Sequence, residues 1–299
     1  MLSVCIPVFN CDVSQLVDKI NYQADNQKIE FEIILIDDCS NFEFKVKNKS
    51  LTQINSVKYI QLENNIGRSK IRNLFLKYVS FNNLLFLDCD SQVLTENFVE
   101  IYINEIKKGE KIICGGRIYN TEKPQLNNFL RWNYGIHREC IPAEIRKKNP
   151  YQSFMTNNFI VHKTILEQIK FNEKLSDYGH EDTLFGYQLK QNKLKVSHIK
   201  NPVNHLFTET NEEFLDKTKQ GIRNLIFIQK GIGNYDFISE VKILKFYSKI
   251  KKYYLKIPFQ VLLYLTKPLV YFPLKKYGRG LLLFDIYKIS ILINEKFKY

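Results

Sequence analysis

The first half of the chain alternates short β-rich runs with amphipathic helical stretches, and this alternation constrains the fold more than any other feature. The strand-like runs, rich in β-branched and aromatic residues, are residues 2–9, 31–37, 57–62 and 83–88. The helix-like segments between them lie near residues 13–24, 68–79 and 95–107. Alternation at this spacing predicts a mostly parallel sheet with helices on both faces, a doubly wound, Rossmann-like α/β domain.

The pattern is more mixed after residue 110. The strand-like runs there are residues 111–119, 156–163 and 194–199, and the helix-like segments are residues 181–191 and 211–229. No internal repeat or low-complexity linker separates these segments from the first half. One domain of roughly 230 residues is therefore expected, covering residues 1–235.

Acidic residues follow two of the predicted buried strands. Asp37 and Asp38 come at the end of the second strand, and Asp88 and Asp90 come at the end of the fourth, within FLDCDS. Ligands of doubly wound sheets bind beyond the carboxyl ends of the strands, so these acids are expected along one crevice. Two carboxylates one residue apart repel each other unless a cation lies between them; the alternative is a solvated turn.

An Asp-x-Asp at such a place suits a divalent cation. Mg²⁺ and Mn²⁺ prefer oxygen ligands and often complete their shells with phosphate oxygens of a substrate. A metal bound there would neutralise a diphosphate leaving group as charge develops on it.

The segment NNIGRSKIRN adds residues suited to an anionic ligand. Gly67 lets the backbone approach a ligand closely, and Arg68 and Arg72 lie four residues apart on one face of a predicted helix. Asp38, at a strand end, is placed to accept a hydrogen bond from a base or ribose. Each residue also has a structural interpretation, as a helix cap, a turn or a solvated face, and only their common order and spacing favours a site.

These stretches together resemble glycosyltransferase family 2, the inverting nucleotide-sugar transferases with a GT-A fold. The resemblance covers roughly residues 1–230. It rests on SVCIPVFN at the start, IDDCS after the second strand, NNIGRSKIRN at the third helix and FLDCDS. It implies a GT-A catalytic domain over residues 1–235, with a nucleotide-sugar half of about 1–118 and an acceptor half of about 119–235.

The resemblance also implies roles for individual residues on the donor side. Pro7 and Phe9 would lie beside the nucleotide, and Asp38 would contact the uracil. Arg72 would help to bind the nucleotide, and Asp88 would lie nearer the ribose. Gly67 and Arg68 complete the expected donor-binding set. The donor is expected to be a UDP-sugar.

The metal and the catalytic base are expected from three further acids and one histidine. The resemblance implies that Asp90 binds Mn²⁺ or Mg²⁺ directly, and that His205, in NPVNHLFTE, completes the metal shell. An inverting transfer also needs a base to take the acceptor's proton. In DYGHEDTLFGY the resemblance implies Asp182 as that base, with Glu181 second or holding an acceptor hydroxyl. The alternatives are a structural histidine and a pair of acids capping a helix.

Two residues are candidates for the acceptor side. Trp132, the only tryptophan, lies in a polar-aromatic stretch, and its ring could stack on a sugar; a hydrophobic staple is an equal alternative. Asn157 lies in the region 154–158 that, with residues 115–117, is expected to shape the sugar pocket.

The charge of the chain is concentrated at its C-terminal end. The net charge is +13, and residues 240–299 hold 13 Lys and Arg against 3 Asp and Glu. This extension, residues 236–299, is expected to be helical and amphipathic. It mixes lysines with aromatic and aliphatic residues, which favours an anionic membrane surface. Packing on the catalytic domain or on a dimer partner is the main alternative. A membrane span is disfavoured because Lys267 and prolines 258, 268 and 273 interrupt the apolar stretch 257–274.

The remaining composition limits the compartment and the rival functions. Six cysteines without CxxC spacing, and a start without a secretory leader, indicate reduced cytosolic thiols and no zinc site. A nucleotidyltransferase would need a glycine-rich basic phosphate loop near the N-terminus, which IPVFNCDVS lacks. A nucleic-acid or non-catalytic glycan-binding protein is disfavoured because residues 1–239 are nearly balanced in charge.

The sequence therefore predicts an inverting hexosyl- or N-acetylhexosaminyltransferase. Its acceptor is expected to be a glycan or lipid-linked glycan of a surface polysaccharide. It is expected to be cytoplasmic and peripheral on the cytosolic face of a membrane.

Overall fold

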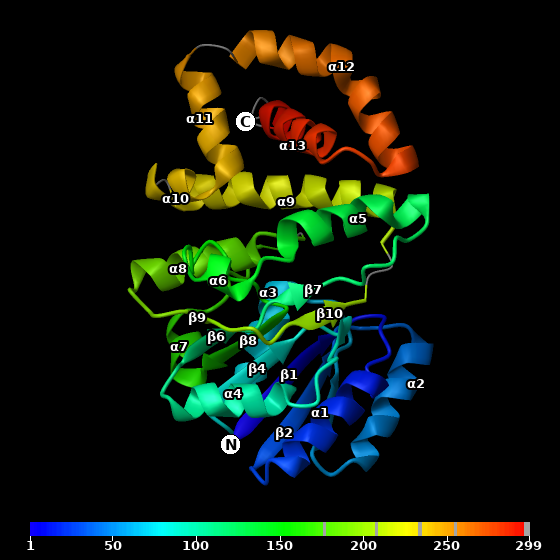
Figure 1. Cartoon of the computed structure of the whole chain (residues 1–299), viewed down its shortest axis with the longest axis vertical. Coiled ribbons are helices and arrows are strands. Elements are labelled where there is room, and N and C mark those ends of the chain that lie inside the picture. The colour runs from blue at the N-terminus through cyan, green and yellow to red at the C-terminus, as the bar shows by residue number, and fades with distance from the viewer. Residues whose placement is uncertain (176–177, 207–208, 233–234, 254–255, 296–299) are drawn as a thin grey trace. The chain divides into compact units, whose positions relative to one another are not determined.

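A seven-stranded sheet carries the first part of the chain, in the strand order β3-β2-β1-β4-β8-β6-β9 (Figure 1). The four strands β3, β2, β1 and β4 are mutually parallel, as their alternation with helices predicts. Strand β8 runs antiparallel to both of its neighbours, β4 and β6, and β9 is parallel to β6. The expected α/β fold with a mostly parallel sheet is confirmed. A second sheet has the order β5-β10-β7.

The computed structural model describes residues 1–175, 178–206, 209–232, 235–253 and 256–295. The strands are β1 (Leu2–Val8), β2 (Phe31–Asp37), β3 (Val57–Gln61), β4 (Asn83–Leu87), β5 (Ser91–Gln92), β6 (Ile112–Cys114), β7 (Arg117–Ile118), β8 (Asn158–His162), β9 (Ser197–His198) and β10 (Val203–His205). The α-helices are α1 (Ser14–Asn26), α2 (Phe42–Ser50), α3 (Arg68–Leu74), α4 (Phe98–Lys107), α5 (Phe129–Tyr134), α6 (Ala143–Arg146), α7 (Lys163–Gln168), α8 (Glu181–Gln191), α9 (Asn211–Ile232), α10 (Tyr235–Glu240), α11 (Lys242–Lys252), α12 (Lys256–Tyr277) and α13 (Leu281–Glu295). Short 3₁₀ turns cover Leu51–Gln53, Phe75–Lys77 and Leu126–Asn128, and a π-helical turn covers Gly135–Glu139.

The chain divides into two compact units. One consists of residues 1–120, 140–176 and 181–206, and the other of residues 121–139, 177–180 and 207–299. Residues 176–177, 207–208, 233–234, 254–255 and 296–299, on which parts of the expected domains fall, lie outside the described residues. The expected boundary between a catalytic domain and an extension at residue 235 stays a prediction. The second compact unit contains residues from both sides of that boundary.

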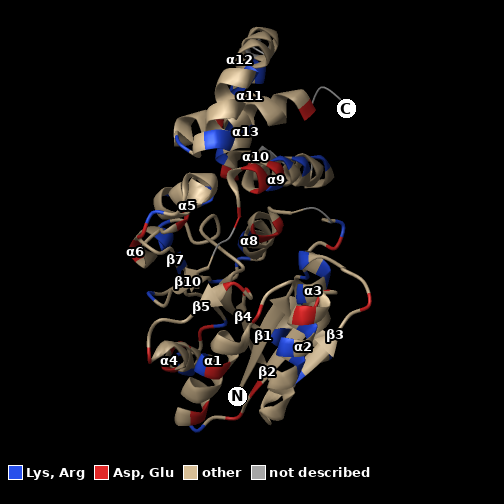
Figure 2. Ribbon diagram, turned by 90° about the vertical axis from the view of Figure 1, so that its right-hand side faces the viewer, with Lys and Arg blue, Asp and Glu red and all other residues tan. Residues whose placement is uncertain are grey.

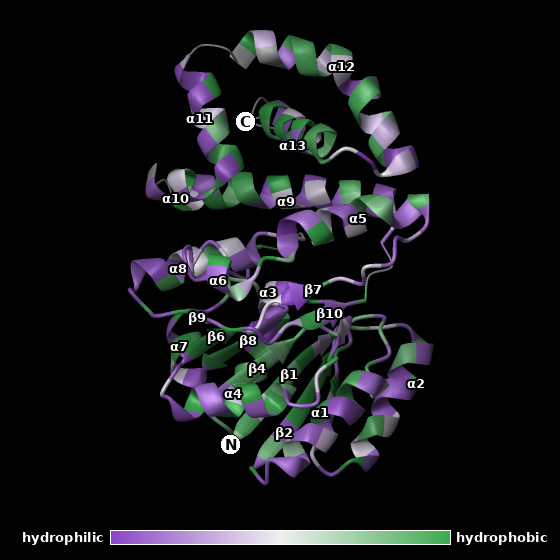
Figure 3. Cartoon of the chain, viewed as in Figure 1, coloured by the Kyte–Doolittle hydropathy of each residue, from purple (hydrophilic) through white to green (hydrophobic). Residues whose placement is uncertain are grey.

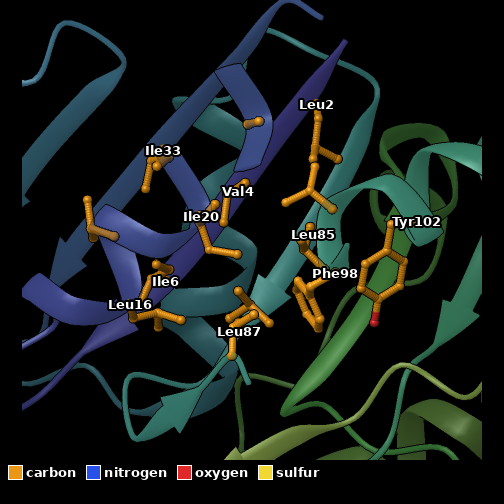
Figure 4. Packing of buried hydrophobic residues seen from close by; sticks show 14 of the residues in the cluster. Leu2, Val4, Ile6, Leu16, Ile20, Ile33, Leu85, Leu87, Phe98 and Tyr102 are labelled. Atoms are coloured by element: carbon orange, nitrogen blue, oxygen red, sulfur yellow. The ribbon is translucent and has the colours of Figure 1, made fainter. Parts of the chain in front are cut away.

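The strands of the first unit are buried on both faces because their side chains alternate between two hydrophobic clusters. In β1, Val4 and Ile6 face one cluster and Cys5 faces the other. The first cluster includes Leu16 and Ile20 of α1 and is shown in Figure 4. The second cluster is aromatic, and it includes Phe75, Phe86, Phe154, Phe159, Phe171 and Phe185. This double burial explains why the strand sequences are nearly continuous apolar runs.

Helices build the second unit around a separate apolar cluster. That cluster consists of Leu130, Phe214, Leu215, Val270, Leu274 and Phe284, from helices α5, α9, α12 and α13. The C-terminal extension is therefore helical, as expected, and one of its faces packs against α5 and α9. Helix α12 continues through Pro268 and Pro273, which were expected to interrupt the apolar stretch. Within the described residues, no helix combines the length and apolarity that crossing a membrane requires.

A buried arginine holds together the segment that follows β6. Arg146, fully buried at the end of α6, donates to the backbone oxygens of Cys114 (3.1 Å), Gly115 (2.9 Å) and Ile199 (2.8 Å). One of its Nη atoms also lies 2.7 Å from Nδ1 of His198, whose Nε2 is 2.8 Å from the oxygen of Pro150. Burial, first, and the positive charge of Arg146 lower the pKa of His198 to about 4, so this ring is neutral and can accept from the guanidinium.

We expect Arg146→Met to lower the free energy of unfolding by about 3 kcal/mol, because it leaves several buried carbonyl groups without a charged donor. Urea denaturation followed by circular dichroism measures the change. Lys147→Met is the matched control, because Lys147 is exposed and only pairs with Glu144 (3.1 Å); its effect should stay below about 0.5 kcal/mol. Equal effects of the two substitutions would contradict the role given to Arg146.

Candidate active site

The carboxyl ends of β2 and β4 bring the predicted acids to one edge of the sheet. Asp37, the last residue of β2, accepts from the Ser40 backbone (2.7 Å) and from the Tyr59 hydroxyl (3.0 Å), and so closes the turn after the strand. Asp88 directly follows β4, and its backbone N–H donates to the oxygen of Asn157 (3.0 Å). The parallel pairing through β1 explains why acids some fifty residues apart share this edge.

Asp38 ties the end of β2 to the loop after β3. Its Oδ1 accepts from the Ile66 N–H at 2.6 Å, and its Oδ2 accepts from the Gly67 N–H at 3.0 Å. Burial raises the pKa of Asp38 in spite of these two hydrogen bonds. Gly67 has φ of +81°, a conformation that a side chain disfavours. The carboxylate thus fixes the loop, while each oxygen keeps a further lone pair for a ligand.

Two arginines of α3 connect the end of β4 with the start of α8. Arg72 is buried and donates to Oδ1 of Asp88 at 2.9 Å, and its guanidinium lies 3.7 Å from Oε1 of Glu181. Arg68, half exposed, donates to the same Glu181 oxygen at 3.2 Å. The predicted spacing of four residues therefore places both arginines on one buried carboxylate.

Glu181 and Asp182 are neighbours with opposite electrostatic surroundings. Burial would raise the pKa of Glu181, but Arg68 and Arg72 lower it below its ordinary value. Burial and then the negative charge of Glu181 raise the pKa of Asp182 to about 6. Asp182 also accepts from the N–H of Thr183 at 2.6 Å. Glu181 is thus held ionised, whereas the pKa of Asp182 is moved towards neutral pH. A general base that works near neutral pH needs such a pKa.

Asp90 and His205 meet because β5, which starts one residue after Asp90, pairs antiparallel with β10. Nδ1 of His205 lies 3.4 Å from Oδ2 of Asp90. Burial would raise the pKa of Asp90, but His205, Arg68 and Arg117 lower it, so the carboxylate stays ionised. Its other oxygen, Oδ1, is buried, and no described residue donates a hydrogen bond to it.

An ionised carboxylate with an oxygen that lacks a donor, beside an imidazole, fits two ligands of a divalent cation. The described residues contain no group of three or more His, Cys, Asp or Glu that could hold a metal by themselves. Other ligands would therefore have to come from elsewhere, as expected for a metal shared with a diphosphate.

Arg117 lies in the range 115–117 that is expected to shape the sugar pocket, but its charge at the end of the sheet was not foreseen. Arg117 is the first residue of β7 and pairs with Val203 of β10, the strand that ends at His205. Its positive charge lowers the pKa of both Asp90 and Asp182. Its Nη1 lies 3.5 Å from the hydroxyl of Tyr119, whose ring meets the ring of His205 edge to face, with centroids 5.2 Å apart. The sequence signal was present, because this arginine directly follows Gly115-Gly116 after a strand.

The other predicted residues are distributed as follows. Pro7 lies near the end of β1, opposite Ile36, and Phe9 follows it with half of its surface exposed. Asn157 is buried beside Asp88, and no described residue donates to its Oδ1. Trp132 belongs to the second unit, where it is buried against Phe129. The binding roles expected for these residues stay predictions.

Solved structures show the same fold. A mannosyltransferase from Pyrobaculum calidifontis, in complex with GDP-Man and Mn²⁺, matches with a TM-score of 0.61 and 11% identity, over 99% of this chain and 87% of that one. Residues 1–349 of TarS from Staphylococcus aureus, in complex with UDP, match with a TM-score of 0.50 and 18% identity, over 99% and 91% of the two chains.

Curated relatives are longer than this chain. The teichoic acid poly(glycerol phosphate) polymerase of Staphylococcus epidermidis is 22% identical over 64% of this chain and 26% of its own length. The poly(ribitol-phosphate) β-N-acetylglucosaminyltransferase TarS of Staphylococcus aureus is 25% identical over 71% of this chain and 36% of its own length. The chain thus spans about a quarter to a third of these two relatives.

The family model of glycosyl transferase family 2 matches residues 3–170, more than half of the chain. The matched region contains the strand ends with Asp38, Asp88 and Asp90 and the arginines of α3. The resemblance seen in the sequence is therefore confirmed: the chain belongs to glycosyl transferase family 2.

Proposed function

We propose that this chain is an inverting glycosyltransferase that transfers a sugar from a UDP-sugar to a glycan or lipid-linked glycan of a surface polysaccharide. Family membership supports the reaction class. The relatives' names, which refer to teichoic acid and poly(ribitol phosphate), support a surface polymer as acceptor. The observation that carries the proposal is the pair Glu181 and Asp182 at the start of α8: Arg68 and Arg72 form ion pairs with Glu181, and the neighbouring Asp182 has a raised pKa.

Asp182 is the proposed general base. An acceptor hydroxyl that attacks the anomeric carbon opposite the diphosphate must lose its proton, and a carboxylate with a pKa near the working pH takes that proton effectively. Glu181 cannot share this role equally, because the ion pairs with Arg68 and Arg72 occupy it and lower its pKa, which makes it a weaker base. Its fixed negative charge instead keeps Asp182 basic.

Asp90 and His205 are the proposed ligands of Mn²⁺ or Mg²⁺. When bound, the metal would neutralise charge on the diphosphate leaving group. Arg72 orients Asp88 through the 2.9 Å contact, so that Asp88 can face the ribose. Pro7, Phe9 and Asp38, at the ends of β1 and β2, form the proposed side of the nucleotide.

A lipid-carried acceptor would require the protein to reach a membrane surface. The basic segment 240–299 supports a peripheral position on an anionic membrane. Deleting this segment is not a clean test, because Val270, Leu274 and Phe284 belong to the apolar core of the second unit. Substitutions on the exposed surface are needed instead.

We expect Asp182→Asn to lower kcat by 10²–10⁴-fold, because the amide cannot accept the acceptor's proton. The affinity for UDP should stay within about twofold, since the substitution removes no proposed donor contact. A panel of UDP- and GDP-sugars with Mn²⁺ identifies the donor, and mass spectrometry of the released nucleotide reports transfer. Asp18→Asn, an exposed acid of α1, is the matched control. Full activity of Asp182→Asn would refute the assignment of the base.

The pH dependence should follow the raised pKa of Asp182. The base form is the ionised one, so kcat/KM should fall as the pH drops through about 6 and should level off above it. Arg117 lowers the pKa of Asp182, so Arg117→Met should move this acidic limb to higher pH. Steady-state rates between pH 4.5 and 9 measure both effects. An unchanged acidic fall of kcat/KM in Arg117→Met would contradict the electrostatic effect of Arg117 on Asp182.

Metal binding should depend on Asp90. In isothermal titration calorimetry, the wild type should bind UDP at least tenfold more tightly with Mn²⁺ than with a chelator. In Asp90→Asn the two affinities should differ little, because the amide is a weak metal ligand. Glu144→Gln, an exposed acid of α6, should behave like the wild type. Metal-independent UDP binding and turnover in the wild type would remove the metal from the mechanism.

A further inference from the structure

Helix α12 is apolar on two opposite sides. Its inner side is buried through Leu263, Val270 and Leu274, of which the last two belong to the core of the second unit. Among the side chains of α12 that the structure describes, seven large apolar ones are more than half exposed: Ile257, Val261, Leu262, Tyr264, Leu265, Leu269 and Phe272. Figure 3 shows green hydrophobic residues in several turns of α12, between white and purple ones. An ordinary surface helix would present polar residues to water.

The seven exposed residues lie together on one side of the helix. At 3.6 residues per turn their positions fall within one continuous arc, and the buried leucines and valine lie on the opposite side. Lys267, the one charged residue between Ile257 and Phe272, projects from outside this arc by the same geometry. A contiguous uncharged face of this size on an exposed helix marks an interaction surface.

Charge decides between the possible occupants of this face. Residues 241–284 contain ten Lys and Arg and no Asp or Glu. Lys242, Lys245, Lys249, Lys251 and Lys252 of α11 are all exposed, and the lysines and arginines are blue in Figure 2. A second copy would bring an equally basic segment against the first, which like-charge repulsion disfavours. An anionic lipid surface offers both an apolar interior and the complementary charge.

We propose that the outer face of α12 lies in the boundary between headgroups and acyl chains of an anionic bilayer, with Lys249, Lys251 and Lys252, at the end of α11 that precedes α12 in the chain, on the headgroups. The helix lies along the membrane plane rather than across it. This inference deepens the proposed function and rests on it for its purpose, because a lipid-carried acceptor is met at that surface. The physical binding itself does not depend on the chemistry of transfer.

Co-sedimentation of the full chain with vesicles tests the proposal. Vesicles with one third phosphatidylglycerol should bind the wild type, and pure phosphatidylcholine vesicles should bind it far less. The double variant Leu265→Glu and Leu269→Glu should lower binding at least tenfold, because two leucines no longer enter the apolar layer. The triple variant Lys249→Gln, Lys251→Gln and Lys252→Gln should lower it about a hundredfold at low salt, at about fivefold per lysine.

A matched control introduces the same two negative charges on exposed apolar residues outside α12. Phe42→Glu with Ile145→Glu alters two exposed apolar residues of the first unit and should leave vesicle binding unchanged. Equal binding by the α12 variant and the wild type would overturn the proposal. Analytical ultracentrifugation without lipid gives a second way to overturn it. If the wild type were dimeric and the α12 variant monomeric, the face would belong to a second copy.

A fluorescent variant tests the same face without adding charge. In Leu265→Trp, the new emission should shift to the blue on vesicles, because the ring enters apolar surroundings, and lipids brominated high on the acyl chain should quench it. The buried Trp132 should not respond. No quenching in bound protein would place α12 away from the bilayer. Sugar transfer to a soluble acceptor, measured without vesicles, should be retained in every α12 variant. Vesicle binding without any transferase activity would leave this inference standing and refute the proposed function.

Discussion

The ion-pair network of Arg72 is the interaction on which the site depends. A buried guanidinium joins Asp88, at the end of β4, to Glu181, at the start of α8, and Arg68 adds a second positive charge to the same glutamate. Buried charges are costly unless they are paired, so removing Arg72 would leave Asp88 without this ion pair and Glu181 with Arg68 alone. The network therefore holds together three elements that are far apart in the chain, and it also sets the charge that Asp182 experiences.

The two neighbouring carboxyls show how position in a network separates chemical roles. Glu181 faces two arginines and stays ionised, whereas Asp182 is left with burial and the charge of Glu181. On the other side, Asp90 keeps an oxygen without a hydrogen-bond donor among the described residues, beside His205. Arg117 acts electrostatically on both Asp90 and Asp182, and its position after Gly115-Gly116 is held by the carbonyl contacts of Arg146. A base and a metal ligand thus share one electrostatic environment.

The second unit has a different physical problem. Its helices bury Val270, Leu274 and Phe284 against α9 and α5, yet α12 also exposes large apolar residues on its opposite side. This second apolar face gains nothing from folding of the chain alone, because it stays in contact with water. An anionic lipid surface would relieve that cost, because it offers an apolar layer for the face and negative charge for the nearby lysines. A second copy would offer the apolar layer but an equally positive charge.

The parallel strands, the acids at their ends and the family could all be read from the amino-acid sequence. These follow from local patterns, because alternating apolar runs specify buried strands and the Asp-x-Asp lies directly at a strand end. Folding in three dimensions was needed to show that Asp38 fastens the loop at Gly67, that Arg68 and Arg72 converge on Glu181, and that the charge of Arg117 acts on Asp90 and Asp182. It also decided that the basic extension contributes to the core of the second unit while α12 keeps an exposed apolar face. Such contacts join residues up to more than a hundred positions apart, and a local pattern carries no information on which distant side chain will compensate a buried charge.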